Sequence, residues 1–405
     1  MPKAELLPVA EALSRILADA KPLPAETVGL DEALGRVLAE DLKALRTQPP
    51  ADVSAMDGYA VRAADVEKSP ATLNIIGEVA AGHPFAGKIG PGEAARIFTG
   101  GVLPAGSDTV VIQEIAKRDG DSVTFGKPTA KGRNVRKQGI DFNEGQVLLR
   151  KDRRLTDRDL MLAAAMNYPK LRVYRRPKVA VFGTGDELVA PGSQPKPGEI
   201  VYSNGFALRA LARNEGAEVI DLDIINDTLE AITAAVRKAR EAQADVLVTT
   251  GGASVGEHDL VQRALAAEGM TLSFWRLALR PGRPMLYGRL GGMQVLGVPG
   301  NPVSSYVCAF LFLVPLVRRL AGRADILPAR EEAILGRDLP ENDEREDYLR
   351  ATLETGPDGP VATPLPNQDS SLMAPLSAAS CLLIRAPVAP KAAAGSSCVI
   401  LKLGL

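Results

Sequence analysis

The sequence predicts a multidomain α/β plus β protein with a central doubly wound α/β domain. The first observation is a regular alternation of strand and helix patterns from Lys178 to about residue 320, which is typical of a mainly parallel sheet. The second is that the segments on either side of this region consist of short strand patterns broken by glycine and proline. The third is that amphipathic helical patterns both precede and follow the first of these β segments, so we expect a helical domain interrupted by a β insertion.

The expected domain boundaries follow these changes of pattern. A discontinuous helical N-terminal linker domain occupies 1–44 and 149–177, and a β insertion domain occupies 45–148. The α/β domain covers 178–327, and Pro328 marks the start of a small C-terminal β domain over 328–405.

The N-terminal elements are two amphipathic helices, over 4–20 and from Leu30 to Leu38. In the insertion we expect an antiparallel sheet or small barrel, with strands at 58–61, 72–79, 94–98, 108–115, 121–125 and 146–149. A helix over 153–168 follows, with Thr156 as N-cap and Asp159 three residues later, which is close to a capping box.

In the α/β domain the expected strands are 178–182, 217–225, 246–250 and 271–279, followed by a hairpin of 285–287 and 293–298. The expected helices are 203–215, 228–242, one from about Glu257 to Glu268, and a long one from Pro302 to about Leu320. The C-terminal strands are 331–338, 347–354, 359–363, 380–386 and 396–402.

Composition restricts the classes of partner. The 405 residues include 48 Lys+Arg and 49 Asp+Glu, so no global basic field attracts nucleic acid or a membrane surface. The longest apolar run, from Tyr306 to Val317, is too short to span a bilayer and contains Pro315. Three widely spaced cysteines without a CxxC favour reduced thiols, and we expect a cytoplasmic protein.

The most informative stretch runs from Asp245 to Asp259, a buried strand followed by a glycine-rich turn and a helix start. Gly251 and Gly252 let a ligand approach the backbone, and Thr249, Thr250 and Ser254 supply hydroxyls. The alternative is a connecting loop that only needs small residues.

Four strands of the predicted sheet end in polar sequence, and the carboxyl ends of parallel strands meet at one edge. This edge would gather Asp186, Glu187, Asp227 and Asp259, a set of hard oxygen ligands suited to Mg²⁺. Taken singly, each Asp after a strand is more often a helix cap.

Arginine and a capped helix lie beside the same edge. Arg276, Arg280 and Arg283 would bind an oxyanion, although an arginine-rich turn alone is usually a solvated surface. In Pro299-Gly-Asn-Pro-Val-Ser-Ser305, Asn301 is the expected N-cap and Pro302 the first helical residue, which leaves Ser304 and Ser305 facing the crevice. A well-capped core helix has the same pattern. The sequence contains neither GxxxxGK[ST] nor a complete GxGxxG.

Six motifs together resemble one known family. They are Ser54-Ala-Met-Asp-Gly-Tyr-Ala-Val-Arg62, Phe98-Thr-Gly-Gly101, Thr184-Gly-Asp-Glu-Leu188, Thr250-Gly-Gly-Ala-Ser-Val-Gly-Glu257, Arg280-Pro-Gly-Arg-Pro284 and Pro299-Gly-Asn-Pro-Val-Ser304. In this order and over essentially the whole chain, they resemble the molybdopterin molybdenumtransferase family, which includes MoeA and the gephyrin E domain. The N-terminal Met-Asp-Gly-Tyr-Ala motif favours this branch over the related adenylyltransferases, and the lack of a long linker favours it over a fused scaffold protein.

The resemblance implies that molybdenum is inserted into the molybdenum cofactor. Adenylylated molybdopterin and molybdate would be the substrates, Mg²⁺ would assist cleavage of the phosphoanhydride, AMP would leave, and the metal would go to the dithiolene. The α/β domain would be the molybdopterin-binding domain. Asp186, Glu187, Asp227 and Asp259 would surround the metal ion and the pterin phosphate, the last three also as catalytic residues.

The resemblance also implies which residues contact the substrates. These are Thr184, Gly251, Gly252, Ser254, Arg276, Arg280, Arg283, Pro299, Asn301, Pro302 and Ser304, with Arg350 and Ser370 from the C-terminal domain. Where this chain has Arg280 and Arg283, the family commonly has lysine.

The family forms a homodimer whose cleft is shared between subunits, which would bring the catalytic candidates Asp57, Thr99 and Asp141 of one subunit toward the α/β domain of the other. Molybdopterin adenylyltransferase and downstream molybdoenzyme machinery are the implied protein partners.

Overall fold

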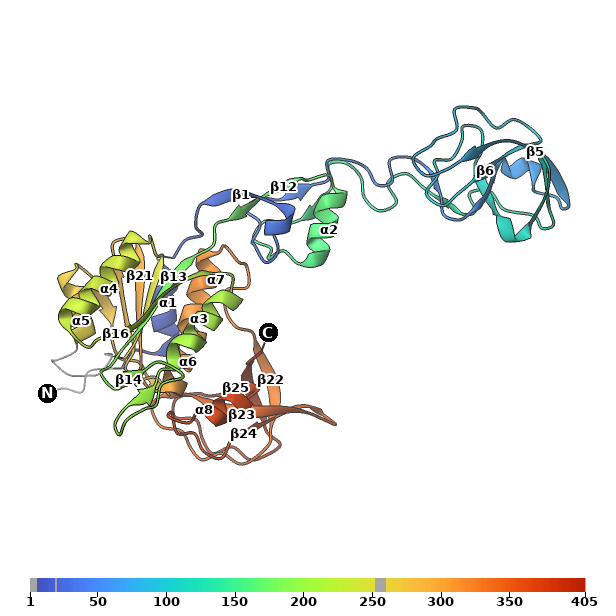
Figure 1. The fold of residues 1–405 in the computed structure, drawn as a ribbon. Helices are drawn as coiled ribbons and strands as arrows, with labels where there is room; N and C mark the ends of the chain where they lie inside the picture. Colours follow the sequence, from blue (N-terminus) through green and yellow to red (C-terminus); the bar gives the residue numbers. More distant parts are fainter. Residues whose placement is uncertain (1–5, 19, 252–259, 405) are drawn as a thin grey trace.

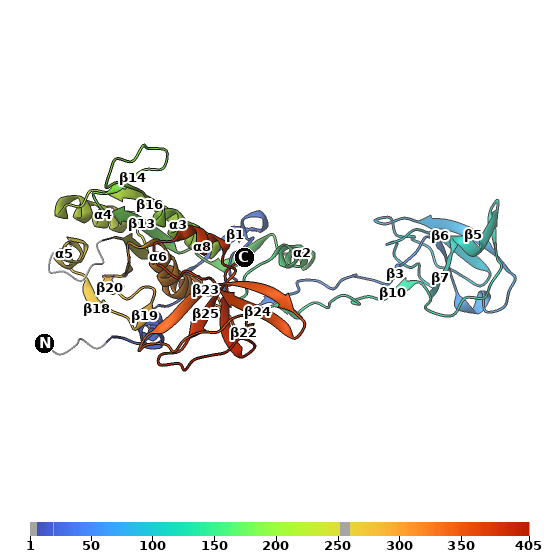
Figure 2. The same ribbon diagram turned by 90° about the horizontal axis from the view of Figure 1, so that it is seen from below.

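The computed structural model of the chain describes residues 6–18, 20–251 and 260–404. Figure 1 shows the α/β sheet with the C-terminal β domain beside it, a small linker domain around β1, β12 and α2, and the β insertion at the far end. Figure 2, turned by 90°, shows the same separation, so the insertion lies apart from the α/β sheet in both views.

The central sheet has six strands in the order β16 (Glu218–Ile225), β13 (Lys178–Thr184), β17 (Val246–Thr250), β21 (Met293–Val298), β20 (Leu286–Leu290) and β18 (Thr271–Phe274). The first four strands are parallel, and β20 pairs antiparallel with both β21 and β18. Runs such as Val246-Leu-Val248 are buried on both faces, which is why they are continuously apolar. The doubly wound prediction is confirmed, with an antiparallel edge.

Helices cover both faces of this sheet. One face carries α1 (Val9–Ala18), α3 (Asn204–Asn214), α6 (Pro302–Cys308) and α7 (Val314–Leu320), whose buried side chains form one core with β13, β17 and β21. The other face carries α4 (Leu229–Glu241) and α5 (Leu260–Ala267) over a second core.

The long helix predicted from Pro302 to Leu320 is present, with a π-helical turn, η4 (Ala309–Leu313), between α6 and α7. Pro315 has no N–H to give to the carbonyl four residues earlier, and a wider turn before it accommodates the ring. By length and composition Pro302–Leu320 could cross a membrane, but 83% of its most apolar window is buried inside the molecule. It packs as a core helix beside α1 and α3.

The linker domain joins β1 (Ala25–Gly29) to β12 (Lys170–Tyr174) and β2 (Leu42–Lys43) to β11 (Val147–Leu149). Helix α2 (Asp157–Ala165) begins with the expected capping box of Thr156 and Asp159. The helix expected from Leu30 to Leu38 is wrong, because only one 3-10 turn, η1 (Leu30–Glu32), forms there. Val37 and Leu38 instead make β-bridges, and Ala33 and Leu38 pack into the linker core from an irregular segment.

The insertion is a six-stranded sheet in the order β7 (Thr109–Ile112), β4 (Gly58–Val61), β6 (Glu93–Ile97), β5 (Ala71–Val79), β9 (Ser122–Phe125) and β8 (Ala116–Asp119), with short helical turns η2 (Ala63–Asp65) and η3 (Gln113–Ile115). A short pair, β3 (Val53–Ser54) with β10 (Val135–Arg136), leads into it. Of the two expected forms, an antiparallel sheet or a small barrel, the sheet is mixed: β5 and β6 pair in parallel, and the other neighbouring strands pair antiparallel.

The C-terminal domain closes on itself. Strands β23 (Glu346–Gly356), β24 (Gly359–Pro364), β22 (Arg330–Leu335), β26 (Ser397–Lys402) and β25 (Cys381–Arg385) are paired in that order, and β25 also pairs with β23. Helix α8 (Met373–Ala378) was not predicted. The predicted strand 271–279 is divided, because β18 ends at Phe274 and the separate β19 (Leu279–Arg280) pairs with β23.

Candidate functional site

Two strand ends of the central sheet bring polar side chains together. The Thr184 hydroxyl at the end of β13 donates to Asp227 Oδ1 at 3.0 Å, and the Asp227 backbone N–H donates to Asp186 Oδ1 at 3.3 Å. Asp186, Glu187 and Asp227 are exposed, whereas Thr184 is buried. The meeting of Thr184, Asp186 and Asp227 follows from the parallel order of β13 and β16, as the sequence predicted.

Gly251, directly after β17, fits this edge only as glycine. Its φ is +90°, and a Cβ added there would lie 2.1 Å from the carbonyl oxygen of Thr184. The turn therefore passes directly against the end of β13, and any larger residue would push the two strand ends apart.

The first turn of α6 links this edge to the C-terminal domain. Asn301 is the N-cap residue and Pro302 the first helical residue, as expected. The Asn301 side chain does not cap the helix, however, but donates from Nδ2 to Ser370 Oγ at 3.1 Å. The backbone N–H of Val303 donates to Ser370 O at 3.0 Å, so Ser370 is fixed beside α6.

Asn204, at the start of α3, joins the ends of β17 and β21. Its Nδ2 donates to Thr250 Oγ1 at 3.0 Å and to Gly300 O at 2.7 Å, and Thr250 Oγ1 lies 3.4 Å from Pro299 O. Ser304, one turn into α6, is buried. From the sequence, Asn204 was placed only within the helix expected over 203–215, and its role in this junction was missed.

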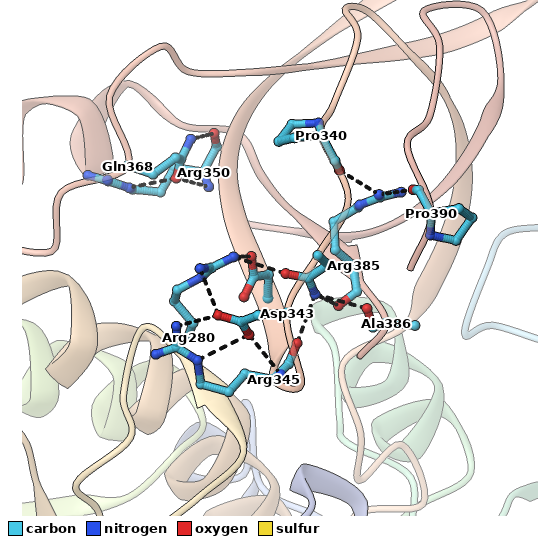
Figure 3. A network of polar contacts seen from close by, with 11 residues as sticks. Arg280, Pro340, Asp343, Arg345, Arg350, Gln368, Arg385, Ala386 and Pro390 are labelled. Atoms are coloured by element: carbon cyan, nitrogen blue, oxygen red, sulfur yellow. Dashed lines mark hydrogen bonds and ion pairs between the residues drawn. The ribbon is translucent and has the colours of Figure 1, made fainter. Parts of the chain in front are cut away.

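Arg280 is held by the C-terminal domain (Figure 3). Its guanidinium donates to Asn342 Oδ1 at 2.9 Å and to Asp343 Oδ2 at 3.2 Å, and forms a short ion pair with Asp347. Asp347 is only 2% exposed, and burial raises the pKa of its carboxyl. These three partners were not predicted, because they lie more than 60 residues away in the chain.

Arg345 completes this network. Its guanidinium and backbone N–H donate to Asp343 at 2.6–3.2 Å and lower the pKa of that carboxyl to about 2. Arg280 can meet an oxyanion only in competition with these carboxylates or through donors that they leave open.

Arg350 uses its guanidinium to hold a loop of its own domain. It is 1% exposed and donates to the carbonyl oxygens of Asn367, Asp369 and Leu372 at 2.9–3.1 Å. Figure 3 shows it beside Gln368, which also accepts from its Nε at 3.4 Å. The Arg350 side chain thereby fixes the loop that carries Ser370, so a contact between Arg350 and an oxyanion would require some of these bonds to be exchanged.

The other two predicted arginines differ in their surroundings. Arg283 is exposed, and its backbone oxygen accepts from Leu277 N at 2.9 Å. The Arg276 guanidinium lies over the Trp275 ring at 4.1 Å, and its Nε has no hydrogen-bond partner among the described residues.

Asp57 and Thr99 meet within the insertion. The Thr99 backbone N–H and hydroxyl both donate to Asp57 Oδ1 at 2.8 Å, which lowers the pKa of the carboxyl. Asp141 is exposed near the base of the insertion, where its N–H donates to Gln48 O at 3.2 Å. Figures 1 and 2 show the insertion far from the α/β sheet, so within one chain Asp57 and Thr99 do not join the site at the sheet edge.

Three predicted site residues, Gly252, Ser254 and Asp259, lie outside the described residues. The donors for a magnesium ion are chemically suitable, because Asp186, Glu187 and Asp227 offer exposed carboxylate oxygens at one edge. Among the residues that the structure describes, no three acidic, cysteine or histidine side chains already form a metal cluster. The donor set would be completed by Asp259 or by water.

Three family models match the chain in succession. The MoeA N-terminal region (domain I and II) matches residues 7–167, a probable molybdopterin binding domain matches 180–319, and the MoeA C-terminal region (domain IV) matches 332–403.

Individual relatives agree with these matches. A protein of Nostoc sp. named molybdopterin molybdenumtransferase is 39% identical over 74% of this chain and 70% of its own length. A relative of the same name from Staphylococcus aureus is 30% identical over 94% of this chain and 92% of its own. The crystal structure of a molybdopterin biosynthesis MoeA protein from Pyrococcus horikoshii is 32% identical, covers 99% of this chain and 100% of its own, and superposes with a TM-score of 0.85.

Proposed function

The chain belongs to the molybdopterin molybdenumtransferase (MoeA) family, and from this membership we propose that it is a transferase that inserts molybdenum into molybdopterin during synthesis of the molybdenum cofactor. The proposed substrates are adenylylated molybdopterin and molybdate, and AMP is the proposed leaving product. The observation that carries the proposal lies at the ends of β13, β16 and β17 and the start of α6. Thr184, Asp227 and Asp186 are joined by hydrogen bonds there, and Asn301 is bonded to Ser370 of the C-terminal domain.

The acidic part of this edge is proposed to handle the phosphoanhydride. Asp186, Glu187 and Asp227, with Asp259, would hold Mg²⁺, and this ion would neutralise the charge of the phosphates so that acidic residues can lie beside them. The Thr184 hydroxyl orients Asp227, because it donates to Oδ1 and leaves Oδ2 for the ligand.

The other part of the edge is proposed to hold molybdate, a tetrahedral dianion. Ser370 is fixed by Asn301 and Val303, and its loop is fixed by Arg350. Arg283 lies three residues after Arg280 and is exposed. Its planar guanidinium could donate two hydrogen bonds to one oxyanion. Serine hydroxyls and guanidinium groups are suitable partners for such an oxyanion.

We further propose a homodimer in which the insertion of one subunit completes the site of the other. Asp57 is an ionised carboxylate with two donors from Thr99, yet the insertion that carries it lies far from the α/β sheet of the same chain. A partner subunit is the simplest way to bring such a prepared side chain to the sheet edge.

The test is reconstitution with adenylylated molybdopterin, following AMP release with and without molybdate. We expect molybdate-dependent AMP release in the wild type and a loss of at least about a hundredfold in Asp227→Asn. Asp223→Asn is the matched control, because Asp223 is an exposed residue at φ +65° on β16, the strand that Asp227 follows, and asparagine tolerates that conformation.

Two results would contradict the proposal. ATP-dependent adenylylation of free molybdopterin would place the enzyme one step earlier. AMP release that is equal in Asp227→Asn and Asp223→Asn would remove the acidic edge from the reaction.

A further inference from the structure

Arg96 of β6 lies beside Asp57, the carboxylate that the insertion would offer to a second subunit. Strand β6 pairs antiparallel with β4, and Arg96 is directly opposite Tyr59 in that register. The Arg96 guanidinium lies over the Tyr59 ring at 5.2 Å and over the Phe98 ring at 4.8 Å, both measured to the ring centroid. A cation over aromatic rings is attracted by them, so these two contacts restrict the position of the guanidinium.

Two hydrogen bonds tie Arg96 to the backbone around Asp57. Its Nη1 donates to the carbonyl oxygen of Gly58, the residue after Asp57, at 3.2 Å, and its Nη2 donates to Gln113 Oε1 at 2.6 Å. The backbone N–H of Gln113 in turn donates to the Asp57 carbonyl oxygen at 3.1 Å. Arg96 therefore holds both the residue that follows Asp57 and the residue that bonds the Asp57 backbone.

The guanidinium makes these contacts without covering the carboxylate. Both bonds from Thr99 reach Oδ1 of Asp57, and within the described residues Oδ2 accepts none. Both Nη atoms of Arg96 donate to neutral acceptors, although a carboxylate is the stronger partner for an arginine. The pKa of Asp57 is lowered mainly by the bonds from Thr99 and further by the charge of Arg96. The cation thus acts on the carboxylate from beside it and leaves it open to a ligand.

A positive charge beside Asp57 would reduce repulsion in the shared site. In the proposed dimer, Asp57 approaches the sheet edge that carries Asp186, Glu187 and Asp227, and all four side chains are acidic. Like charges that are brought together in a cleft repel one another, and both proposed substrates are anions as well. The Arg96 cation would offset part of this repulsion while the Asp57 carboxylate stays ionised.

We propose that Arg96 is a positioning residue of the shared site, which holds Asp57 in place for the partner subunit and offsets its charge. This inference rests on the proposed function and on the proposed homodimer. Arg96 would act through Asp57 and not on the substrate itself, because both of its Nη atoms are used within the insertion.

The experiment compares molybdate-dependent AMP release by the full-length protein and three variants. Arg96→Gln removes the charge, and Arg96→Lys keeps it. Arg118→Gln is the matched control, because Arg118 is exposed on β8 of the same sheet and donates to Gly120 O at 2.9 Å. We expect kcat to fall at least about tenfold in Arg96→Gln, because a small displacement of a catalytic group lowers the rate steeply. Arg96→Lys should regain most of kcat, and Arg118→Gln should keep the wild-type value.

The pH dependence of kcat separates positioning from a role in folding. Removal of the cation raises the pKa of the Asp57 carboxyl, so the acidic limb of the profile should move to higher pH in Arg96→Gln. Arg96→Lys should move it back. A lower melting temperature with an unmoved acidic limb, and a loss of kcat that lysine does not restore, would make Arg96 structural and overturn the proposal.

Mixed dimers test whether Arg96 and Asp57 belong to the same half of the site. Arg96→Gln that is unfolded and refolded together with Asp227→Asn should regain about a quarter of wild-type activity, since half of the dimers are mixed and each has one intact site. Arg96→Gln refolded with Asp57→Asn should stay low, because every insertion then carries one of the two changes. Equal recovery in both mixtures would separate Arg96 from Asp57 and overturn the proposal.

The inference and the proposed function can fail separately. If the wild type releases AMP in a molybdate-dependent way and Arg96→Gln has the same kcat as Arg118→Gln, the inference about Arg96 fails and the proposed function stands. If the wild type itself shows no molybdate-dependent release of AMP, both fail.

Discussion

The two β domains of this chain have opposite relations to the α/β sheet. The C-terminal domain is joined to it by β19, which pairs with β23, by the ion pairs of Arg280, and by the bond between Asn301 and Ser370. The insertion follows the linker domain and lies far from the sheet in both views. A domain that is docked can place residues in the site of its own chain. A domain that is held at a distance is suited to the site of another.

The largest expected effect tests whether the insertion acts on a second subunit. Asp57→Asn and Asp227→Asn should each be inactive as pure proteins, because each removes one half of every shared site. When the two are unfolded together and refolded as a mixture, half of the dimers are mixed and each has one intact site, so about a quarter of wild-type activity should return. AMP release in the mixture measures it.

Mixing without refolding provides the control, since subunits that do not exchange should stay inactive. No activity in refolded mixtures that contain mixed dimers would mean that Asp57 and Asp227 act within one chain, and the comparison above would fail.

A pair of glycine substitutions tests whether the two regions unfold separately. Gly251 has φ +90° and a Cβ there would meet Thr184 O at 2.1 Å, while Gly106 in the insertion has φ +88° and a Cβ there would meet Ile89 O at 2.3 Å. Alanine at either position should lower the free energy of unfolding of its own domain by about 2–4 kcal/mol.

Urea unfolding followed by two signals measures the effect. Trp275, the single tryptophan of the chain, lies just after β18 and reports on the α/β domain, whereas circular dichroism reports on all domains. Gly251→Ala should move the tryptophan transition, and Gly106→Ala should leave it in place. An equal shift of the tryptophan signal in both variants would show that the insertion and the sheet unfold as one unit.

Two helix caps give a smaller effect in the linker and α/β domains. Thr156 caps α2 with a reciprocal box to Asp159, and Thr228 caps α4 by accepting from Ala231 N at 3.2 Å. Alanine at either threonine should cost about 1 kcal/mol of unfolding free energy. Serine at the same position is the control, because it keeps the accepting hydroxyl and should restore most of the loss in thermal unfolding.

The smallest effect concerns pH and the docked C-terminal domain. Bonds from Arg345 hold the pKa of Asp343 at about 2, so its contribution to stability is present above the usual pKa of 3.8 and is lost as pH falls toward 2. Burial raises the pKa of Asp347, so the folded state binds a proton more readily there. That contribution is present at low pH and is lost as pH rises from 3.8 through the raised value.

Unfolding free energies measured by urea from pH 2 to 7 should separate the two carboxyls. In a plot of unfolding free energy against pH, Asp343→Asn should reduce the slope below about pH 4. Asp347→Asn should reduce the decrease of unfolding free energy above about pH 4. The same change of slope in both variants would contradict the opposite signs.

Much of the α/β domain could be predicted, because its strands and helix caps are determined by residues that are close together in the sequence. Continuous apolar runs identified β13, β17 and β21, and the rule that parallel strands end at one edge brought Thr184, Asp186 and Asp227 together. The capping box at Thr156 could be predicted for the same reason, since its partners are three residues apart.

The features that could not be predicted depend on distant partners. Leu30–Leu38 has helical periodicity, but its apolar residues fill the linker core from an irregular chain. The family resemblance predicted Arg350 as an oxyanion ligand. Its guanidinium donates to backbone carbonyls of the 367–372 loop, and the path of that loop could not be read from the sequence. Likewise, nothing local to Arg280 indicates Asn342, Asp343 and Asp347.

The base of the insertion has a consequence for how such a chain could have been assembled. The Gln48 N–H donates to Phe142 O at 2.9 Å, and the two residues form an antiparallel bridge. The polypeptide therefore departs and returns at adjacent points, as it does at the open end of a hairpin. The segment between Gln48 and Phe142 could therefore be inserted into the linker domain, or removed from it, without a change in the path of the rest of the chain.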